Sequence, residues 1–247
     1  MNWPEKLVIL SFFSLLLSCG IQEYYYLPQV AESNIESSLV NSATIRFPSI
    51  AQYYYATHYS IFYRIYISGE TWPTITTQSD MNNVNPELAR DFSFFLRYTE
   101  NTSSSSLITN ADTFKSRNYY EIELDGEDVE NIFTKYGGTL SILFQPIPGT
   151  FPTVSLNGGD EIRLRRSGEL TSPLPQGDLF FRNTPELNDN ENATSEKNAD
   201  VTGRAEITDR YTYVSMYIVA RGYNSEIFSQ IFGKPTHIHI FRLPDSD

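Results

Sequence analysis

The chain has 247 residues but only one cysteine, Cys19, and three histidines. A single cysteine excludes a disulfide within the chain and a metal site built from several thiolates. A Gly-x-Ser-x-Gly motif, which presents the nucleophile in many hydrolases, is also missing. The Gly-Gly pairs at 137–138 and 158–159 precede strand-like patterns, not the helix starts that bind phosphate. We therefore expect a protein that is not an enzyme and that uses no cofactor.

Basic residues are few: 18 lysines and arginines are outnumbered by 30 aspartates and glutamates, which gives a net charge of −12. An acidic chain is repelled by phosphate backbones, so nucleic acid is not expected as a partner. It is also repelled by an anionic membrane surface. Attachment to a membrane therefore has to come from lipid and not from a basic patch.

Long hydrophobic runs are equally scarce, and the clearest one stands at the N-terminus. It extends from Leu7 to Leu17, is interrupted by two serines, and follows the basic Lys6. A run of ~7–15 apolar residues behind a basic head is typical of an export signal, whereas a membrane span needs ~18 or more. The small Ser18 and then Cys19 follow the run. The sequence thus predicts a signal peptide over residues 1–18.

The segment Leu16-Leu17-Ser18-Cys19 resembles the lipobox of bacterial lipoprotein precursors. The resemblance implies that the Cys19 thiol receives a diacylglycerol, that residues 1–18 are removed, and that the new amine is acylated, with palmitate as a typical chain. It also implies membrane anchoring in the cell envelope. The absence of an acidic residue directly after Cys19 favours the outer membrane. The alternatives are a signal peptide with a fortuitous cysteine and an anchor that is not cleaved.

Residues 19–28 are predicted to form a lipidated N-terminus with a short tether, and residues 29–247 are predicted to form a single domain. The tether contains the triplet Tyr24 to Tyr26, which is unlike a flexible Gly/Ser linker. The triplet is expected to begin the folded part, or alternatively to dip into the membrane interface, where tyrosine is enriched. Residues 183–204 lack aromatic side chains and are acidic, so a mobile loop is expected there.

Aromatic residues are abundant at 14% of the chain, with 17 Tyr and 16 Phe, and this excess favours strands. The strongest strand pattern covers Thr57 to Ser68, where Tyr, Ile and polar residues alternate. The mixed second face, which includes Arg64, predicts a sheet buried on one side only. The residues on its apolar face are Tyr59, Ile61, Tyr63, Ile65 and Ile67.

Weaker strand patterns are spread along the rest of the chain, with a hairpin-like Gly158-Gly159 between two of them. Asn85-Pro86 begins a helix over Glu87–Tyr98, and a second short helix is expected within Asp125–Lys135. The predicted fold class is mainly β: an antiparallel, fibronectin- or immunoglobulin-like β-sandwich with one or two short helices and long loops. The weaker strands are Ala43–Phe47, Tyr119–Leu124, Thr139–Phe144, Thr153–Leu156, Glu161–Arg166, Leu179–Arg182, Tyr211–Ala220 and Thr236–Leu243.

Two further resemblances concern the body of the chain. The run Phe62-Tyr63-Arg64-Ile65-Tyr66 is similar to a central strand of fibronectin-type domains. The layout of lipobox, Tyr-rich start, sandwich and Pro-Thr-His-Ile ending resembles envelope lipoproteins of spirochaetes, a family that implies a location but no activity.

The histidines are the weak candidates for a metal site. His237 and His239 are two apart in one predicted strand and are expected to point to the same side. If the strand with His58 were a neighbour, three imidazoles could converge on a metal. The favoured interpretation is that Ile238 and Ile240 face the core while both histidines are partly exposed to solvent. No metal is therefore expected. Calcium at Asn188–Asn192 is not favoured either, because the loop lacks the Gly and terminal Glu of a calcium loop.

The triplet Tyr53, Tyr54 and Tyr55 is the candidate binding patch, for an envelope protein or a glycan. The alternative is that these rings pack at a sandwich edge with wet hydroxyls. We thus predict a lipid-anchored envelope protein with a non-catalytic binding or structural role. A solute-binding lipoprotein for a sugar or peptide is the alternative, and an envelope hydrolase is less favoured. Whether the protein faces the periplasm or the outside is left open.

Overall fold

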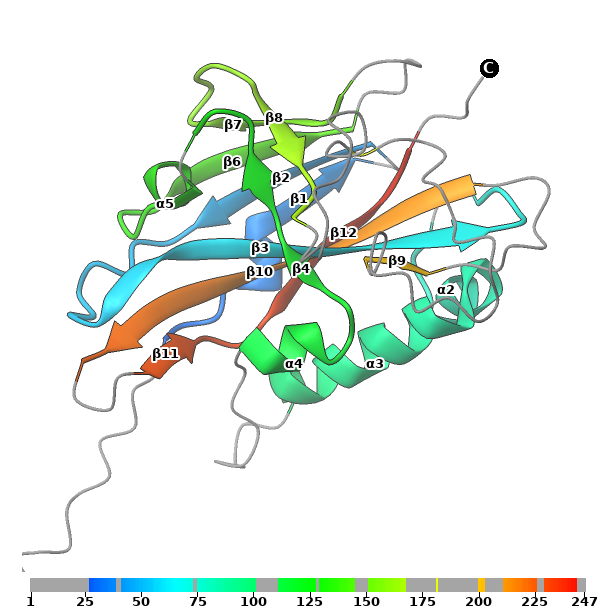
Figure 1. The fold of residues 1–247 in the computed structure, drawn as a ribbon, viewed down its shortest axis with the longest axis horizontal. Helices are drawn as coiled ribbons and strands as arrows, with labels where there is room; N and C mark the ends of the chain where they lie inside the picture. The colour runs from blue at the N-terminus through cyan, green and yellow to red at the C-terminus, as the bar shows by residue number, and fades with distance from the viewer. Residues whose placement is uncertain are drawn as a thin grey trace, which may run out of the picture.

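Two β-sheets pack face to face, and helices cover the outer face of one of them (Figure 1). The structure is a computed structural model that describes residues 27–38, 41–72, 75–100, 111–127, 129–144, 151–167, 181, 200–202, 211–225 and 229–243. The predicted mainly β, antiparallel sandwich is confirmed.

The first sheet has six antiparallel strands in the order β1-β2-β6-β7-β8-β5. The hairpin between β7 and β8 begins with Asn157 and Gly158, both at positive φ (52° and 72°), as a tight two-residue turn requires. Gly159 N–H donates to the Leu156 carbonyl and closes this turn. The elements of this sheet are β1 (Ile35–Ser38), β2 (Ser42–Phe47), β5 (Glu123–Leu124), β6 (Gly138–Leu143), β7 (Thr153–Leu156) and β8 (Ile162–Arg165), with the 3-10 turn η1 (Glu32–Asn34) before β1.

The second sheet is built around the long antiparallel pair β3 and β10. Strands β11 and β12 both pair with β10, along different parts of its length, and β4 pairs with β3. The two-residue β9 is the one parallel partner among the strands described, again on β3. The elements are β3 (Ala56–Ser68), β4 (Tyr120–Glu121), β9 (Val201–Thr202), β10 (Tyr211–Asn224), β11 (Ser229–Phe232) and β12 (Thr236–Arg242).

The main core lies between the two sheets. The apolar face predicted for β3 is confirmed, because all five of its side chains are buried there. Ile45, Leu140 and Val154 enter the same core from the first sheet, and Val214 and Phe241 enter it from the second. Period-2 alternation is therefore enough to identify the inner face of these strands.

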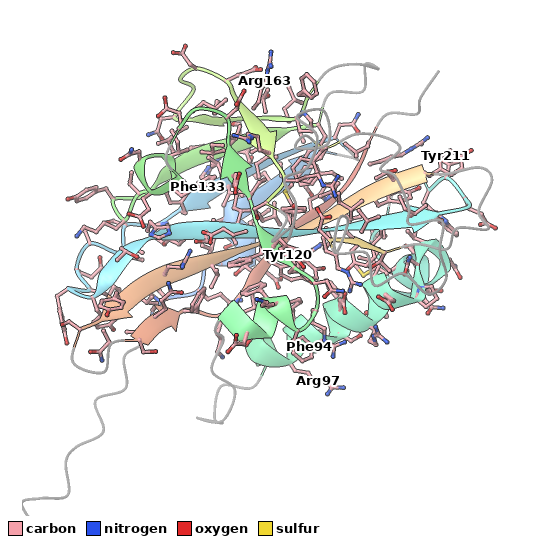
Figure 2. All side chains as sticks on the ribbon, in the orientation of Figure 1. Phe94, Arg97, Tyr120, Phe133, Arg163 and Tyr211 are labelled. Carbon is pink, nitrogen blue, oxygen red and sulfur yellow. The ribbon has the colours of Figure 1, made fainter. Side chains whose placement is uncertain are left out.

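The outer face of the second sheet is buried as well. The prediction that the sheet containing β3 is exposed to solvent on one side is therefore wrong. It is covered by α2 (Gln78–Val84), α3 (Pro86–Glu100) and α4 (Ala111–Lys115) (Figure 1). Phe62 stacks on Phe114 of α4 at 3.9 Å, and Tyr66 lies in the cluster with Leu88 of α3. In Figure 2, Phe133 belongs to the layer between the sheets and Phe94 to the layer beside the helices. The fold thus has three layers, and the polar side chains of β3 other than Thr57 are inside.

The helix predicted at Glu87 is α3, and Asn85 begins it as expected, because its Oδ1 accepts from Glu87 N–H. The second predicted helix is the single turn α5 (Val129–Ile132). Helix α2 was not among the predicted helices. Its local signal in the sequence is the capping box formed by Thr77 and Asp80.

Other segments also differ from the predictions. Residues 29–41 contain η1 and β1, although no element was predicted there. The predicted strand 119–124 is divided at buried Ile122, so that β4 joins one sheet and β5 the other. In the predicted mobile loop 183–204, Asp200 is buried and β9 follows it, while residues 183–199 and 203–204 lie outside the described residues.

Candidate functional site

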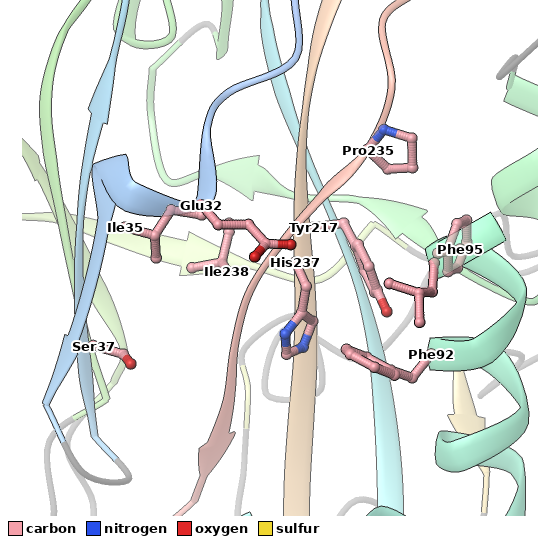
Figure 3. Close-up of a pocket in the computed structure, with 10 residues that line it drawn as sticks. Glu32, Ile35, Ser37, Phe92, Phe95, Tyr217, Pro235, His237 and Ile238 are labelled. Carbon is pink, nitrogen blue, oxygen red and sulfur yellow. The ribbon is translucent and has the colours of Figure 1, made fainter. Parts of the chain in front are cut away.

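A cavity of about 250 Å³ lies where the edges of the two sheets meet α3 (Figure 3). It is smaller than the ~300–1,000 Å³ of drug-sized sites, and so suits a small molecule or a single side chain. Most of the residues that line it are apolar, and the polar ones are Glu32, Ser37 and His237. The lining residues are Glu32, Ile35 and Ser37 from η1 and β1, Phe92, Phe95 and Leu96 from α3, Tyr217 from β10, and Pro235, His237 and Ile238 from the β12 segment.

The Tyr217 hydroxyl is the unusual group in this cavity. Its side chain is 2% exposed, and its oxygen has no hydrogen-bond partner among the residues that the structure describes. The ring is held by Phe95 at 4.6 Å and by Tyr119 at 5.5 Å. Figure 3 shows the hydroxyl directed into the space between α3 and His237. Because burial raises the pKa of Tyr217 well above its ordinary value, the hydroxyl keeps its proton and is available as a donor.

His237 stands beside this hydroxyl because of a β-bulge. Met216 pairs with His239 and Tyr217 pairs with His237, so one extra residue is inserted in β12 between the two pairs. His237 consequently shares the helix-side face with Tyr217, while His239 shares the inner face with Met216. The prediction that both histidines point to one side is wrong. The neighbouring isoleucines are separated in the same way: Ile238 packs in the main core and Ile240 in the cluster beneath α2 and α3.

The imidazole of His237 is neutral at physiological pH. Burial, with a smaller contribution from His239, lowers its pKa to about 3. The ring lies edge-on to Phe92 with centroids 5.3 Å apart, and its Nε2 is 3.5 Å from Ser215 Oγ. This Ser–His contact is not a hydrolytic pair in its present geometry. The separation is long for a hydrogen bond, the base is weak, and Ser215 is 1% exposed and does not line the cavity.

Behind the cavity, a buried chain of polar groups joins the sheet to α3. Ser215 Oγ accepts from the Tyr119 hydroxyl at 3.2 Å, and the hydroxyls of Tyr119 and Tyr66 are 3.0 Å apart. Tyr66 donates to Asp91 at 2.7 Å, and the same carboxylate is paired with Arg64. Asp91 and Arg64 are 0% and 4% exposed, so each charge depends on the other.

This chain ends at a second, more polar hollow of about 880 Å³ between the end of β3 and the α2–α3 corner. Glu87 lies on its wall and accepts from Arg64 Nη2 at 2.6 Å and from Arg90 at 3.1 Å. Asn85 on the same wall donates to the Ile67 carbonyl. The polar groups named here are already engaged, whereas the Tyr217 hydroxyl is not. We therefore take the smaller cavity as the candidate site.

The third histidine is distant from the other two. His58 pairs with Arg221 of β10, four positions beyond Tyr217, which is ~13 Å along a strand. Its Nδ1 lies 3.7 Å from Glu130 Oε1. In the described part of the chain, no group of three or more His, Cys, Asp or Glu is placed to hold a metal ion. The three imidazoles do not converge.

The tyrosine triplet lies in the connection between β2 and β3, and its three members differ. Tyr54 is 75% exposed, whereas Tyr53 and Tyr55 are half-buried against the main core. The Tyr54 and Tyr55 rings are edge to face at 5.0 Å. Two of the rings therefore pack against the core and one is exposed, while a binding role of the triplet stays a prediction.

Several predicted features lie outside the described residues: the signal peptide, Cys19, the Tyr24–Tyr26 triplet and the Asn188–Asn192 segment. No helix among the described residues is both long enough and apolar enough to cross a membrane. Of the cavity residues, Phe92, Phe95 and Leu96 belong to the helix that was predicted over Glu87–Tyr98. Glu32 and Ile35 were missed, because the short η1–β1 segment has no clear pattern.

Comparison with known proteins found no match to this chain among family models, curated proteins or solved structures.

Proposed function

We propose that the chain is a lipid-anchored cell-envelope protein that binds a small ligand, without catalysis, in the cavity between β1, β12 and α3. The observation that carries the binding role is the buried Tyr217 hydroxyl without a partner. A buried donor left unsatisfied costs about 1–3 kcal/mol, and an acceptor on a ligand recovers that free energy. Binding sites are a common place for such groups, whereas structural interiors avoid them.

The lining defines the class of ligand. The rings of Phe92, Phe95 and Tyr217 favour an apolar, preferably aromatic body, and the hydroxyl requires one acceptor such as a carbonyl. Neutral His237 offers no positive charge, and the Glu32 carboxylate at the wall disfavours anions. The proposed ligand is therefore small, aromatic or aliphatic, uncharged, and equipped with a hydrogen-bond acceptor.

The location is supported by the lipobox-like Leu16-Leu17-Ser18-Cys19 and by the apolar run before it. Acyl chains contribute ~0.8 kcal/mol per buried methylene, and more than one chain is needed for stable anchoring. Metabolic labelling with palmitate tests this part. The parent should incorporate label and pellet with membranes, and Cys19→Ser should do neither. Equal labelling of the two proteins would exclude the anchor.

Benzamide and benzoate test the binding site, because they share a ring and differ in charge. Perturbed NMR signals of Phe92 and His237 should report benzamide binding in the millimolar range, with benzoate much weaker. Tyr217→Phe keeps the ring and removes the donor, so it should weaken benzamide binding ~5–10-fold. Equal affinity of parent and variant, or no saturable perturbation by benzamide, would rule out this site.

A second candidate ligand is a sugar, in the larger hollow beside α2 and α3. The observation in its favour is a wall that includes the exposed amides of Asn82 and Asn83 together with Glu70 and Arg90. Titration with monosaccharides, read from the amide signals of these residues, distinguishes the two sites. Perturbation confined to Asn82 and Asn83 would move the binding role to this hollow.

A further inference from the structure

The three large apolar side chains that are most exposed in the described part of the chain lie at one end of the sandwich. They are Tyr54 at 75%, Tyr136 at 71% and Tyr223 at 45%, and we call them the tyrosine end. Nothing in a strand pattern requires exposed rings to gather in this way, and an exposed cluster of large side chains indicates an interaction surface.

Backbone hydrogen bonds show that the segments carrying the three tyrosines are neighbours. Tyr54 belongs to the β2–β3 connection. The next residue in the chain, Tyr55, accepts from Tyr223 N–H through its carbonyl at 2.8 Å. Tyr136 lies in the turn before β6, next to Lys135, whose carbonyl accepts from Ile50 N–H in that same connection. Figure 1 shows the β2–β3 connection, the start of β6 and the end of β10 at one end of the molecule.

The described chain also begins at this end. A methyl group on Gly222 would lie 3.2 Å from Leu27 Cδ1 and 2.5 Å from the Tyr55 carbonyl oxygen, so Leu27 is beside the last residues of β10. From there the chain runs away from the tyrosine end, because the Val30 carbonyl accepts from Thr236, which pairs with Ile218 farther along β10. Followed backwards, the chain leads toward the tyrosine end.

The length of the tether limits which end can meet the membrane. Cys19 precedes Leu27 by eight residues, which span at most ~29 Å when fully extended. Strand β3 has 13 residues, which is ~43 Å, and it runs from the tyrosine end to Ser68 at the opposite end. An anchor at Cys19 therefore reaches the bilayer easily from the tyrosine end, and cannot reach past the far end of the sheet.

We propose that the tyrosine end is a membrane-contacting surface, which seats on the lipid headgroups beside the anchor while β3 and β10 stand away from the bilayer. The proposal rests on the lipid anchor of the proposed function. Tyrosine suits this place because its ring enters the interface while its hydroxyl remains hydrated. Lys135 Nζ lies 5.8 Å from the Tyr136 ring and adds one cation. The chain as a whole is acidic, so the surface fits zwitterionic lipid and does not depend on anionic lipid.

The native tryptophans allow a direct test. After removal of residues 1–18, Trp72 is the single tryptophan. It lies at the opposite end of the sheet, where its backbone N–H donates to the Tyr213 hydroxyl at 2.7 Å. The acylated protein is reconstituted in phosphatidylcholine vesicles with brominated acyl chains, and Tyr54→Trp, Tyr136→Trp and Tyr223→Trp are compared with the parent. Each introduced indole should lose several-fold more emission than Trp72, and anionic lipid should not increase the loss.

Two measurements separate the possible failures. The mass of the mature protein shows whether Cys19 is acylated. If the acyl chains are absent, both the lipid anchor and this orientation on the membrane are wrong. If the protein is acylated but the introduced tryptophans are quenched no more than Trp72, the membrane-contacting surface is wrong while the anchor stands. A photo-crosslinker at Tyr54 in intact envelopes then identifies the occupant. Crosslinks to lipid support the proposal, and crosslinks to a protein overturn it.

Discussion

Replacing Tyr217 with phenylalanine should stabilise the folded protein, although it removes a hydrogen-bonding group. The ring packs against Phe95, Tyr119 and His237, and Phe retains those contacts. The hydroxyl is buried without a partner, so folding takes it from water without replacing its hydrogen bond. Removing the hydroxyl should therefore raise the free energy of unfolding, because the unsatisfied group destabilises the folded protein.

The size of the effect follows from that missing bond. An unsatisfied buried polar group costs about 1–3 kcal/mol, so we expect the substitution to raise the free energy of unfolding by at least about 1 kcal/mol. For a domain of this size, that corresponds to a rise in Tm of roughly 2–4 °C.

Tyr119 offers a matched control in the same cluster. It is also buried, at 2% exposure, and its ring contacts Tyr217, but its hydroxyl bonds to Tyr66 and Ser215. Tyr119→Phe should therefore destabilise the protein by about 1–3 kcal/mol. The same substitution thus has opposite signs at two adjacent tyrosines.

Thermal unfolding and denaturant titration of the parent and both variants measure these differences. A destabilised Tyr217→Phe would mean that the hydroxyl has a partner in the folded protein. In that case the main support for the ligand site would disappear. A Tyr217→Phe variant that is stabilised and also binds benzamide less tightly would support two claims: the hydroxyl has no partner in the free protein, and it donates to the bound ligand.

Three other perturbations test other parts of the structure. Asp91→Asn should cost about 3–5 kcal/mol in denaturant titration, because it removes the fully buried carboxylate beside Arg64 and leaves only the partly exposed Glu87 to balance that charge, whereas Glu36→Gln in an exposed pair should cost less than ~1 kcal/mol. His237 is neutral in the folded protein down to about pH 3 but takes up a proton below about pH 6.5 when unfolded, so stability falls as pH decreases between these values, by at most ~1.4 kcal/mol per pH unit. His237→Gln should lessen this fall between pH 7 and pH 4.5 in denaturant midpoints, and an unchanged slope would show that another group is responsible. Gly222→Ala should lower the free energy of unfolding by about 1–3 kcal/mol, because its methyl would meet a backbone carbonyl oxygen at 2.5 Å, and an unaffected Tm would contradict that close approach.

The strands and the main helix were predictable because their signals are local. Alternation in Thr57–Ser68 identified the inner face of β3, and Asn85-Pro86 identified the start of α3. The outer face of β3 could not be identified in the same way. Arg64 is buried because Asp91, 27 residues away, neutralises it from α3, and no spacing rule connects these two positions.

The site depends on features of the same non-local kind. Alternation predicted one shared face for His237 and His239, but a bulge against Met216 and Tyr217 places them on opposite faces. Whether a tyrosine hydroxyl finds a partner also depends on residues from other elements. The hydroxyl of Tyr119 is bonded, and that of Tyr217 is not, although both belong to strongly aromatic segments.

The sequence by itself therefore determined the class of fold, the inner faces of its long strands, the start of α3 and the expectation of a lipid anchor, because each depends on a short stretch of neighbouring residues. Only the tertiary structure decided which polar groups are buried, that Tyr217 lines a cavity, and that the segments carrying three exposed tyrosines lie side by side near the start of the described chain. Those outcomes depend on how segments far apart in the chain are brought together, and local periodicity carries no information about that.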